Sequence, residues 1–341
     1  MKEISTIGLD LAKNVFQIHG LDAEGHVLVR RQLRRGEVIG FFAGLKPCLV
    51  GMEACATAHF WARELAKLGH EVRLMPPAYV KPYVKRGKTD TADASAIAEA
   101  VMRPTMRFVA VKSAGQQSVL MLHKVRDLLV RQRTALINAL RGHLGEFGII
   151  APQGARKVPA LIEALQTAGE EVIPELARDA LQMLVGQLRF VETRIAKAEA
   201  AILAWHRSSE ASRRLAMIPG VGPITASAIA ATVPDARLFE SGRQFAAWLG
   251  LTPQPRSSGG KQRLGRISRQ GNSYVRRLLV TGMTAVIRYA RTRAGGNSWV
   301  AQLLERKPTR LVSVALANKT ARVAWAMLAR NQSYVAAAPS T

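Results

Sequence analysis

Four carboxylates are the residues of this chain whose types and positions could do chemistry together. Asp10 and Glu53 each follow a short apolar run, and Asp90 and Asp93 stand close together in KTDTADASAIAEA. Ionised carboxylates that share one place repel one another unless cations lie between them, and oxygen ligands of this kind suit Mg²⁺, with Mn²⁺ as the expected substitute. Two such ions could activate a nucleophile and stabilise the departing oxygen of a phosphate. The acids therefore predict two-metal chemistry on a phosphodiester.

The second reactive segment is a basic, glycine-broken stretch from Gly250 to Arg277, which contains the adjacent serines Ser257 and Ser258 and no carboxylate. Its cations, which are suited to holding phosphates, are Arg256, Lys261, Arg263, Arg266, Arg269, Arg276 and Arg277. A serine hydroxyl needs activation before it can attack, and this segment offers no histidine or carboxylate as a base. We therefore expect metal ions held by the distant acids to help the serine. A site that joins the acids of one subunit to the serine loop of another is one hypothesis, and a site within one subunit stays open.

Short strands that alternate with helices predict the scaffold of the acids over residues 1–110. Strands are predicted at Ile4 to Leu9, Val15 to His19, His26 to Arg31, Cys48 to Met52 and Glu71 to Met75, with a helix at Thr57 to Leu68. The first three strands should be antiparallel, and the order β-β-β-α-β-α-β is that of ribonuclease-H-like domains. On this scaffold Asp10 and Glu53 end neighbouring strands.

Asp90 and Asp93 are three residues apart on a helix that should end before Pro104, so they project to one face. Any one of the four acids alone could be a turn or cap residue. Four of them in ribonuclease-H order favour a metal site. The competing interpretation, an actin-like sugar kinase, needs a glycine after the acid of GLDLAK, where Ala12 and Lys13 stand.

The charge of the chain points to a polyanionic partner. The formal net charge is +25 and the pI is about 11.1. From Ser241 to Thr341 there are seventeen Lys or Arg residues and one carboxylate, so nucleic acid is the first candidate. No apolar run approaches the roughly 20 residues of a spanning helix, and MKEISTIGLDLAK lacks a signal-peptide apolar region, which predicts a cytoplasmic protein. Cys48 and Cys55 lack the spacing of a zinc site.

Residues 111–208 predict a helical, coiled-coil-like arm. Apolar residues recur at spacings of three to five from Leu120 to Leu144 and again from Leu181 to Ile202, and the breaker Gly148 to Gly154 separates the two runs. The two runs predict an antiparallel helical pair. Its arginines, Arg126, Arg131, Arg133 and Arg141, could equally be a solvated face or a nucleic-acid track.

Residues 209–332 predict a mainly helical domain that begins with AMIPGVGPITASAIAATV. Gly220 and Gly222 in this motif indicate a helix-hairpin-helix, in which backbone amides at a helix N-terminus approach a DNA phosphate. A plain packed hairpin is the alternative. Helices are predicted at 242–249, 273–289 and 311–329, with the serine loop between the first two, and a frayed tail at 333–341.

The motifs GLDLAK, GMEACAT, KTDTADA, IPGVGPITA and GLTPQPRSSGGKQRLGRISRQGN occur in this order, and with them the chain resembles, nearly end to end, the DEDD transposases of bacterial insertion sequences in the IS110 family. The resemblance implies a RuvC-like N-terminal domain, a coiled-coil arm and a C-terminal transposase domain with a nucleophilic serine. It also implies guidance by a noncoding bridge RNA that pairs with donor and target DNA, and a nucleoid-associated protein of a bacterium.

Carried over by motif, Asp10, Glu53, Asp90 and Asp93 match the metal-binding acids, and Ser258, followed by Gly259, best matches the serine that forms a phosphoserine link to DNA. Two adjacent serines leave the match to Ser257 or Ser258 open. Exchange of two duplexes needs several active sites, which suggests a homodimer or homotetramer. The alternatives are a metal-dependent RuvC-like junction nuclease without a serine nucleophile, and an architectural DNA-binding protein without enzymatic activity.

Overall fold

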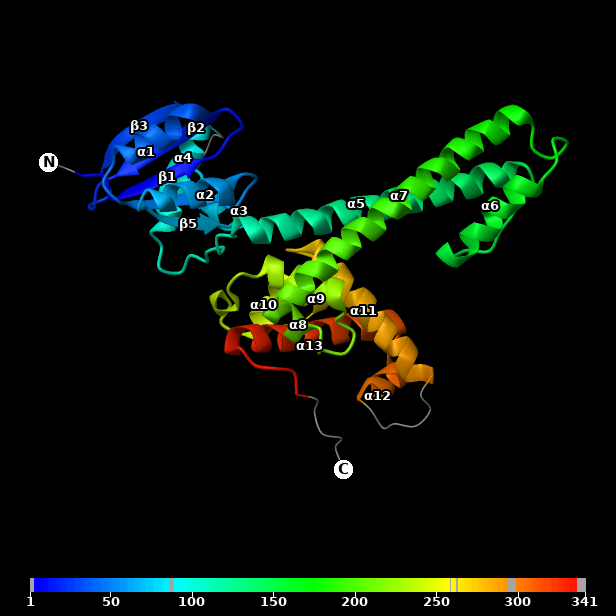
Figure 1. The fold of residues 1–341 in the computed structure, drawn as a ribbon. Coiled ribbons are helices and arrows are strands. Elements are labelled where there is room, and N and C mark those ends of the chain that lie inside the picture. Colours follow the sequence, from blue (N-terminus) through cyan, green and yellow to red (C-terminus); the bar gives the residue numbers. More distant parts are fainter. Residues whose placement is uncertain (1–2, 86–88, 258, 262, 293–298, 336–341) are drawn as a thin grey trace. The chain divides into compact units, whose positions relative to one another are not determined.

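The computed structural model describes residues 3–85, 89–257, 259–261, 263–292 and 299–335 (Figure 1). It divides into two compact units, each of which is described by itself. The first unit comprises residues 1–117, 233–246 and 328–331, and the second comprises residues 118–232, 247–327 and 332–341. In the first unit, helices cover a mixed sheet, whereas the second is mainly helical.

A five-stranded sheet with the order β3-β2-β1-β4-β5 forms the centre of the first unit. Its strands are β1 (Thr6–Asp10), β2 (Val15–Leu21), β3 (Val27–Arg34), β4 (Leu49–Glu53) and β5 (Glu71–Met75). The first three strands are antiparallel, and β1, β4 and β5 are parallel. The predicted number and chain order of these strands are confirmed. Four of them end later than predicted, at Asp10 in β1, Leu21 in β2, Arg34 in β3 and Glu53 in β4.

Helices cover the sheet on both sides. An apolar core with Phe16, Phe42 and Trp61 joins the strands to α1 (Val38–Ala43) and α2 (Ala58–Lys67). On the other side, α4 (Asp90–Val101) lies directly on β1 and β4, where Gly8 and Gly51 are side by side. A Cβ at Gly8 would come within 2.1 Å of the Ala94 carbonyl oxygen, and one at Gly51 within 2.7 Å of the Val101 Cβ. The absence of side chains at Gly8 and Gly51 therefore allows α4 to pack closely against the sheet.

Two short helices, α3 (Pro77–Val80) and the 3-10 helix η2 (Lys81–Tyr83), follow β5. Val80 packs with Ala96, Ile97 and Val101 of α4 in a second apolar cluster. These short helices therefore lie beside the helix that carries Asp90 and Asp93.

Two long helices, α5 (Ala114–Glu146) and α7 (Glu175–Ser208), form the arm with α6 (Val158–Thr167). In Figure 1, α5 and α7 run along each other in opposite directions, with α6 at one end of the pair. Leu140, Leu161 and Leu188, one from each helix, share one apolar core. The apolar stripe predicted from Leu181 to Ile202 on α7 is confirmed. Of its seven residues only Leu184 is half-buried, and the buried ones are Leu181, Leu188, Val191, Ile195, Ala198 and Ile202. Helix α6 was not predicted.

In the first half of α5, the predicted apolar stripe is wrong, because two of its apolar residues are exposed. Val125 and Leu128 are 43% and 49% exposed, whereas His123 is 1% exposed. The His123 ring makes hydrogen bonds of 3.1 Å to the Tyr274 hydroxyl and of 3.1 Å to the Ser227 hydroxyl. Burial, and then the charge of Arg126, lower the pKa of His123 to about 4, so the imidazole is neutral. A polar residue therefore supplies the contact that the apolar pattern assigned to its neighbours.

Most of the predicted arginines of the arm make contacts with other residues of the protein. Arg126 pairs with Glu199 at 2.6 Å, and Arg131 lies 3.7 Å from Asp127. Arg141 donates to the Pro152 carbonyl at 2.9 Å. Three of the four arginines of α5 thus have structural contacts, which favours a structural role over a nucleic-acid track.

The remainder of the second unit is mainly helical, as predicted. It contains α8 (Glu210–Leu215), α9 (Pro223–Thr232), α11 (Ser273–Thr292), α12 (Trp299–Arg306) and most of α13 (Thr309–Arg330), while α10 (Gly242–Trp248) spans the boundary between the units. The predicted serine loop contains a hairpin of β6 (Pro253–Pro255) and β7 (Leu264–Ile267). The hairpin and α12 were not predicted. Within the described ranges, no helix combines the length and the apolar character that crossing a membrane requires.

Candidate active site

Three of the predicted acids gather at one edge of the sheet. Asp10 is the last residue of β1, and Asp90 and Asp93 are in the first turn of α4. Each offers a carboxylate oxygen, and these oxygens all lie within 4.8 Å of one another. Asp10 and Asp93 are half-buried and Asp90 is exposed. The three side chains can therefore hold a common cation that remains accessible to a substrate.

Glu53 lies in the same cleft as Asp10 and Asp93, at the end of β4. Burial, and then the charges of Asp10 and Asp93, raise the pKa of the Glu53 carboxyl. A raised pKa means that the ionised carboxylate is unfavourable there, and a divalent cation would remove this penalty. The donor set consists of carboxylate oxygens, which fits Mg²⁺ or Mn²⁺.

The capped N-terminus of α4 determines the position of Asp90 and Asp93, which lie in its first turn. The hydroxyl of Thr89 caps the helix by accepting the Ala92 N–H at 3.2 Å. Carboxylates in the first turn are also favoured by the helix dipole. Because Gly8 and Gly51 admit α4 to the sheet, this turn lies beside the ends of β1 and β4.

The same cleft, which has a volume of about 690 Å³, is also lined by two lysines that were not predicted as site residues. Lys81 and Lys85 are both exposed. A cleft with carboxylates on one side and ammonium groups on the other can hold a metal ion and a phosphate together. The basic run KPYVKRGK directly before Thr89 is the signal that could have found them.

Two hydrogen bonds hold the serine loop together next to the strands of its hairpin. The N–H of Arg256 donates to the Arg263 carbonyl at 2.8 Å, and the Ser257 hydroxyl accepts the N–H of Arg263 at 3.2 Å. Ser257 is exposed, and the predicted nucleophile Ser258 lies outside the described residues. The described part of the loop therefore closes on itself at Ser257.

The loop's cations fall into two groups. One group is exposed on or beside the hairpin and comprises Arg256, Lys261, Arg263, Arg266 and Arg269. The other group makes contacts within the protein. Arg276 donates to the carbonyls of Leu249 at 2.7 Å and Gln270 at 2.6 Å, and Arg277 pairs with Asp127 of α5. Burial lowers the pKa of Arg276.

The two glycines before α9 have different surroundings. Gly220 has φ 81°, and a Cβ on it would come within 2.4 Å of Met283 and 2.6 Å of Val286 in α11. It is therefore a packing glycine as well as a turn residue. Gly222 is exposed and a Cβ on it would meet nothing within 4 Å, so the start of α9 is open to a ligand at this residue.

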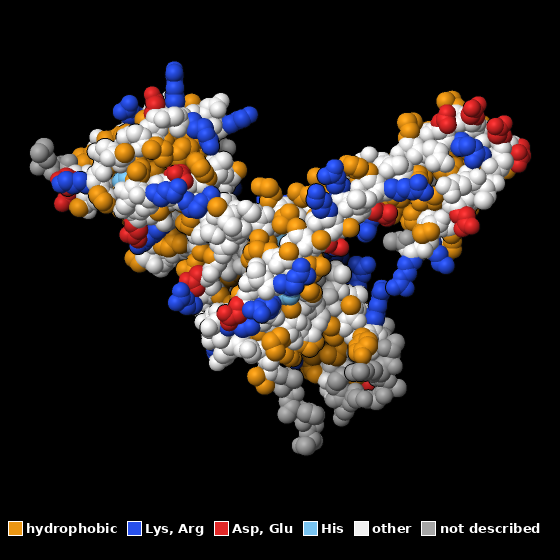
Figure 2. Space-filling view, viewed as in Figure 1, with side chains coloured by type: hydrophobic (Ala, Val, Ile, Leu, Met, Phe, Trp, Pro, Cys, Tyr) orange, Lys and Arg blue, Asp and Glu red, His pale blue; other side chains and the backbone are white. Residues whose placement is uncertain are grey.

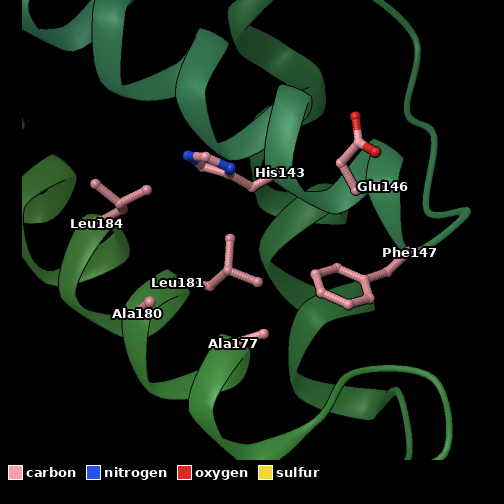
Figure 3. Close-up of a pocket in the computed structure, with 7 residues that line it drawn as sticks. All are labelled: His143, Glu146, Phe147, Ala177, Ala180, Leu181 and Leu184. Carbon is pink, nitrogen blue, oxygen red and sulfur yellow. The ribbon is translucent and has the colours of Figure 1, made fainter.

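A second hollow, of about 490 Å³, lies in the arm between α5 and α7 (Figure 3). Its lining is Phe147, Ala177, Ala180, Leu181 and Leu184 with His143 and Glu146. Figure 3 shows the Glu146 carboxylate pointing away from the leucines. The hollow therefore presents mainly apolar surface and no group of converging acids.

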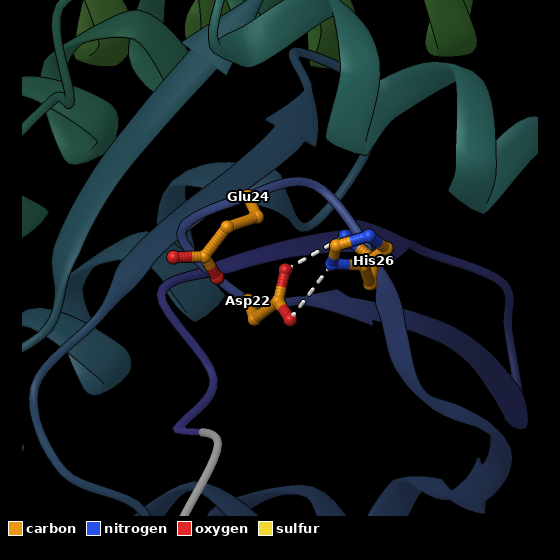
Figure 4. Close-up of side chains that lie close together, drawn as sticks. All are labelled: Asp22, Glu24 and His26. Atoms are coloured by element: carbon orange, nitrogen blue, oxygen red, sulfur yellow. Dashed lines mark hydrogen bonds and ion pairs between the residues drawn. The ribbon is translucent and has the colours of Figure 1, made fainter.

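A second acidic group, Asp22, Glu24 and His26, belongs to the turn between β2 and β3 (Figure 4). The Asp22 carboxylate accepts the backbone N–H of His26 at 2.7 Å and lies 3.3 Å from the His26 ring. In Figure 4 the Glu24 carboxylate lies beside Asp22, on the side opposite His26, and within 4.8 Å of both. These bonds are those of an Asx-type turn, which accounts for the cluster.

The chain is similar to known proteins along nearly its whole length. A protein-family model described as Transposase IS116/IS110/IS902 family matches residues 212–296, and a DEDD model of IS110, described as Transposase, matches residues 7–149. A Pseudomonas aeruginosa protein named probable family 20 transposase is 52% identical, over 97% of this chain and 98% of its own. The transposases for insertion sequence elements IS1111A of Coxiella burnetii and IS1328 of Yersinia enterocolitica are each 40% identical. These two matches cover 98% and 95% of this chain and 92% and 97% of theirs.

Proposed function

Because this chain belongs to the IS116/IS110/IS902 family of transposases, we propose that it cuts and rejoins DNA strands through a covalent serine–phosphate intermediate formed at an acid-bound metal site. The observation that carries this proposal is the convergence of Asp10, Asp90 and Asp93, of which Asp10 and Asp93 line one cleft with Glu53 and two lysines. The order of the strands and the position of α4 support a RuvC-like, ribonuclease-H-like assignment of this domain.

The four acids would hold Mg²⁺. When bound, the ion would supply Lewis-acid stabilisation of negative charge on the phosphate and would lower the pKa of a nearby hydroxyl. Lys81 and Lys85 would bind non-bridging phosphate oxygens at the rim of the same cleft. The raised pKa of Glu53 supports this assignment, because a bound cation favours its ionised form.

The serine of the basic loop would be the nucleophile. Its oxygen forms a bond to phosphorus and loses its proton, while one P–O bond to deoxyribose breaks and the departing oxygen takes up a proton. One phosphodiester is exchanged for another, so rejoining needs no ATP. Ser258 is the proposed residue. Ser257 is the less suitable one, because its hydroxyl already accepts the N–H of Arg263 within the loop.

Nucleic-acid binding would use the exposed hairpin cations, Arg256, Lys261, Arg263, Arg266 and Arg269, and the open N-terminus of α9 at Gly222. The latter would act as a helix-hairpin-helix that contacts the DNA backbone rather than bases. Arg276, Arg277 and Gly220 would support these elements from within. A protein that reads backbone needs another source of sequence information, which a bridge RNA paired with donor and target DNA would supply.

The arm would carry assembly. Met121, Val125 and Leu128 of α5 recur at helical spacing and are 65%, 43% and 49% exposed, which favours a homodimer or homotetramer joined by coiled-coil contacts. In this proposal, residues 1–110 form the catalytic domain, residues 111–208 the arm and residues 209–332 the transposase domain, ahead of the tail 333–341. The charge of +25 favours association with the nucleoid.

The test is strand cutting by the purified chain with Mg²⁺, using DNA from the end of its own insertion sequence and RNA transcribed from that end. We expect cutting, rejoining, a protein–DNA adduct and a discrete RNA that copurifies. Cutting without an adduct would instead indicate a junction nuclease in which water attacks. Binding without cutting would indicate an architectural protein, and the absence of a bound RNA would contradict the guided mechanism.

A further inference from the structure

The sheet face that carries Asp10 does not end at the acid cluster. Cross-strand partners point to the same face of a sheet, and two rows cross β1, β2 and β3 on this face. The rows are Asp10–Gln17–Gln32 and Gly8–His19–Arg30. Arg34 is two residues beyond Gln32 on β3, so its side chain shares this face too. The outer strand of the sheet therefore presents two arginines and a glutamine on the side of the acids.

The interval between the acids and β3 is polar. Gln17 and His19 are 6% and 5% exposed, and the Gln17 Oε1 and His19 Nδ1 atoms have no hydrogen-bond partner among the described residues. Burial, followed by the charges of Arg30 and Lys85, lowers the pKa of His19. Since Lys85 lines the acid cleft, the two cations flank the same imidazole. The cationic rim of the cleft thus continues toward β3.

The side chains of Arg30, Gln32 and Arg34 are exposed. In the described part of the chain, no carboxylate forms an ion pair with the guanidinium of Arg30 or Arg34, although Arg34 forms a capping box with Glu37, which accepts the backbone N–H of Arg34. Arginines on an edge strand also prevent pairing with other strands. That role does not depend on the face, because Arg31, which points to the opposite side, would serve equally well.

We infer that Arg30, Gln32 and Arg34 form a track for the DNA strand that is cut, leading away from the scissile phosphate at the acid cluster. The inference rests on the proposed function, which places that phosphate beside Asp10. Two strand spacings, about 10 Å, separate β1 from β3. The track therefore contacts phosphates of the first few nucleotides beside the cut. The charge of the track fits a polyanion, and its continuity with the acid cleft selects the strand being cut.

The direct test is photocrosslinking in the full chain bound to a DNA duplex from the end of its insertion sequence and RNA from that end. Gln32 is replaced by p-benzoylphenylalanine in one variant and Arg31 in a control on the opposite face of the same strand. We expect the probe at position 32 to crosslink the cut strand within the first few nucleotides beside the cut. The probe at position 31 should crosslink at least tenfold less DNA.

Charge substitutions give a second readout that does not depend on cutting. R30Q and R34Q should each reduce the slope of log affinity against log salt concentration by about one, and R31Q should leave it unchanged. Equal crosslinking from both positions, equal slopes for all three variants, or crosslinks at position 32 to RNA or to a second protein copy would overturn the inference. Failure of the wild-type chain to cut would refute the proposed function, whereas the crosslinks and slopes decide the track on bound DNA.

Discussion

A substitution of Asp10 tests whether the acid cluster takes part in DNA cutting. D10N keeps the shape of the side chain but removes its charge, so a bound cation loses a ligand. A bound metal contributes several kcal/mol to such a transition state, and we expect cutting to fall by roughly 10³-fold. Mg²⁺ should raise the Tm of the wild type, and D10N should lose most of that rise.

The matched control for D10N is E24Q, which removes one exposed carboxylate from the first unit outside the acid cleft. Its cutting rate and its Mg²⁺-dependent Tm should equal those of the wild type. Cutting by D10N at the wild-type rate would exclude the acid cluster from the reaction.

Glu53 predicts a pH dependence of stability. Its folded-state pKa is raised by burial and by Asp10 and Asp93, so protonation of Glu53 favours the folded state. In metal-free protein this contribution is fully present below the usual value of 4.5 and is lost as the pH rises through the raised pKa. E53Q removes the loss. At pH 7 without metal, its Tm should exceed that of the wild type.

Thermal unfolding of both proteins from pH 4 to pH 8 measures this difference. The Tm advantage of E53Q should grow with pH and should shrink when Mg²⁺ is added, because a cation stabilises the ionised carboxylate of the wild type. A lower Tm for E53Q at pH 7 without metal would contradict the assigned burial and repulsion.

The packing of α11 against the turn before α9 is tested at the scale of elements. Gly220 requires a positive φ and leaves no space for a Cβ, whereas Gly222 is open. Strain and overpacking in G220A should together cost about 2–4 kcal/mol and lower the Tm by about 5–10 °C. G222A is the control and should change the Tm little. A Tm for G220A equal to that of G222A would show that the turn does not pack against α11.

How far the sequence predicts elements depends on what positions them. The α7 stripe from Leu181 to Ile202 was predictable because one face of that helix packs along most of its length. The start of α5 was not, because His123 is buried through hydrogen bonds to Tyr274 and Ser227, far away in the sequence. The β6–β7 hairpin was also missed, since its strands have three and four residues and little apolar alternation.

The same reasoning applies to the site. Strand ends and the spacing of Asp90 and Asp93 predict a shared edge, and the structure brings Asp10, Asp90 and Asp93 together there. Lys81 and Lys85 were missed although the basic run KPYVKRGK contains them, because their place in the cleft depends on how α3 and η2 pack beside α4. Residue types also did not show that Arg276 is occupied by the Leu249 and Gln270 carbonyls.

At the scale of the whole molecule, the net charge of +25 predicts binding that weakens steeply with salt. Only cations that meet phosphates contribute to that slope. R263Q, in the exposed hairpin, should reduce the slope by about one without changing the Tm. R276Q should lower the Tm, because two carbonyls lose their donor, and should leave the slope nearly unchanged. Equal slopes for R263Q and the wild type would remove Arg263 from the interface.

The central claim, that a serine of the basic loop becomes linked to DNA, is tested most directly by trapping the protein–DNA adduct on a denaturing gel. Wild type, S258A and S257A are compared with Mg²⁺, DNA from the end of the insertion sequence and RNA from that end. The account predicts an adduct for the wild type and S257A, and neither adduct nor cutting for S258A. Cutting by S258A at the wild-type rate would contradict it.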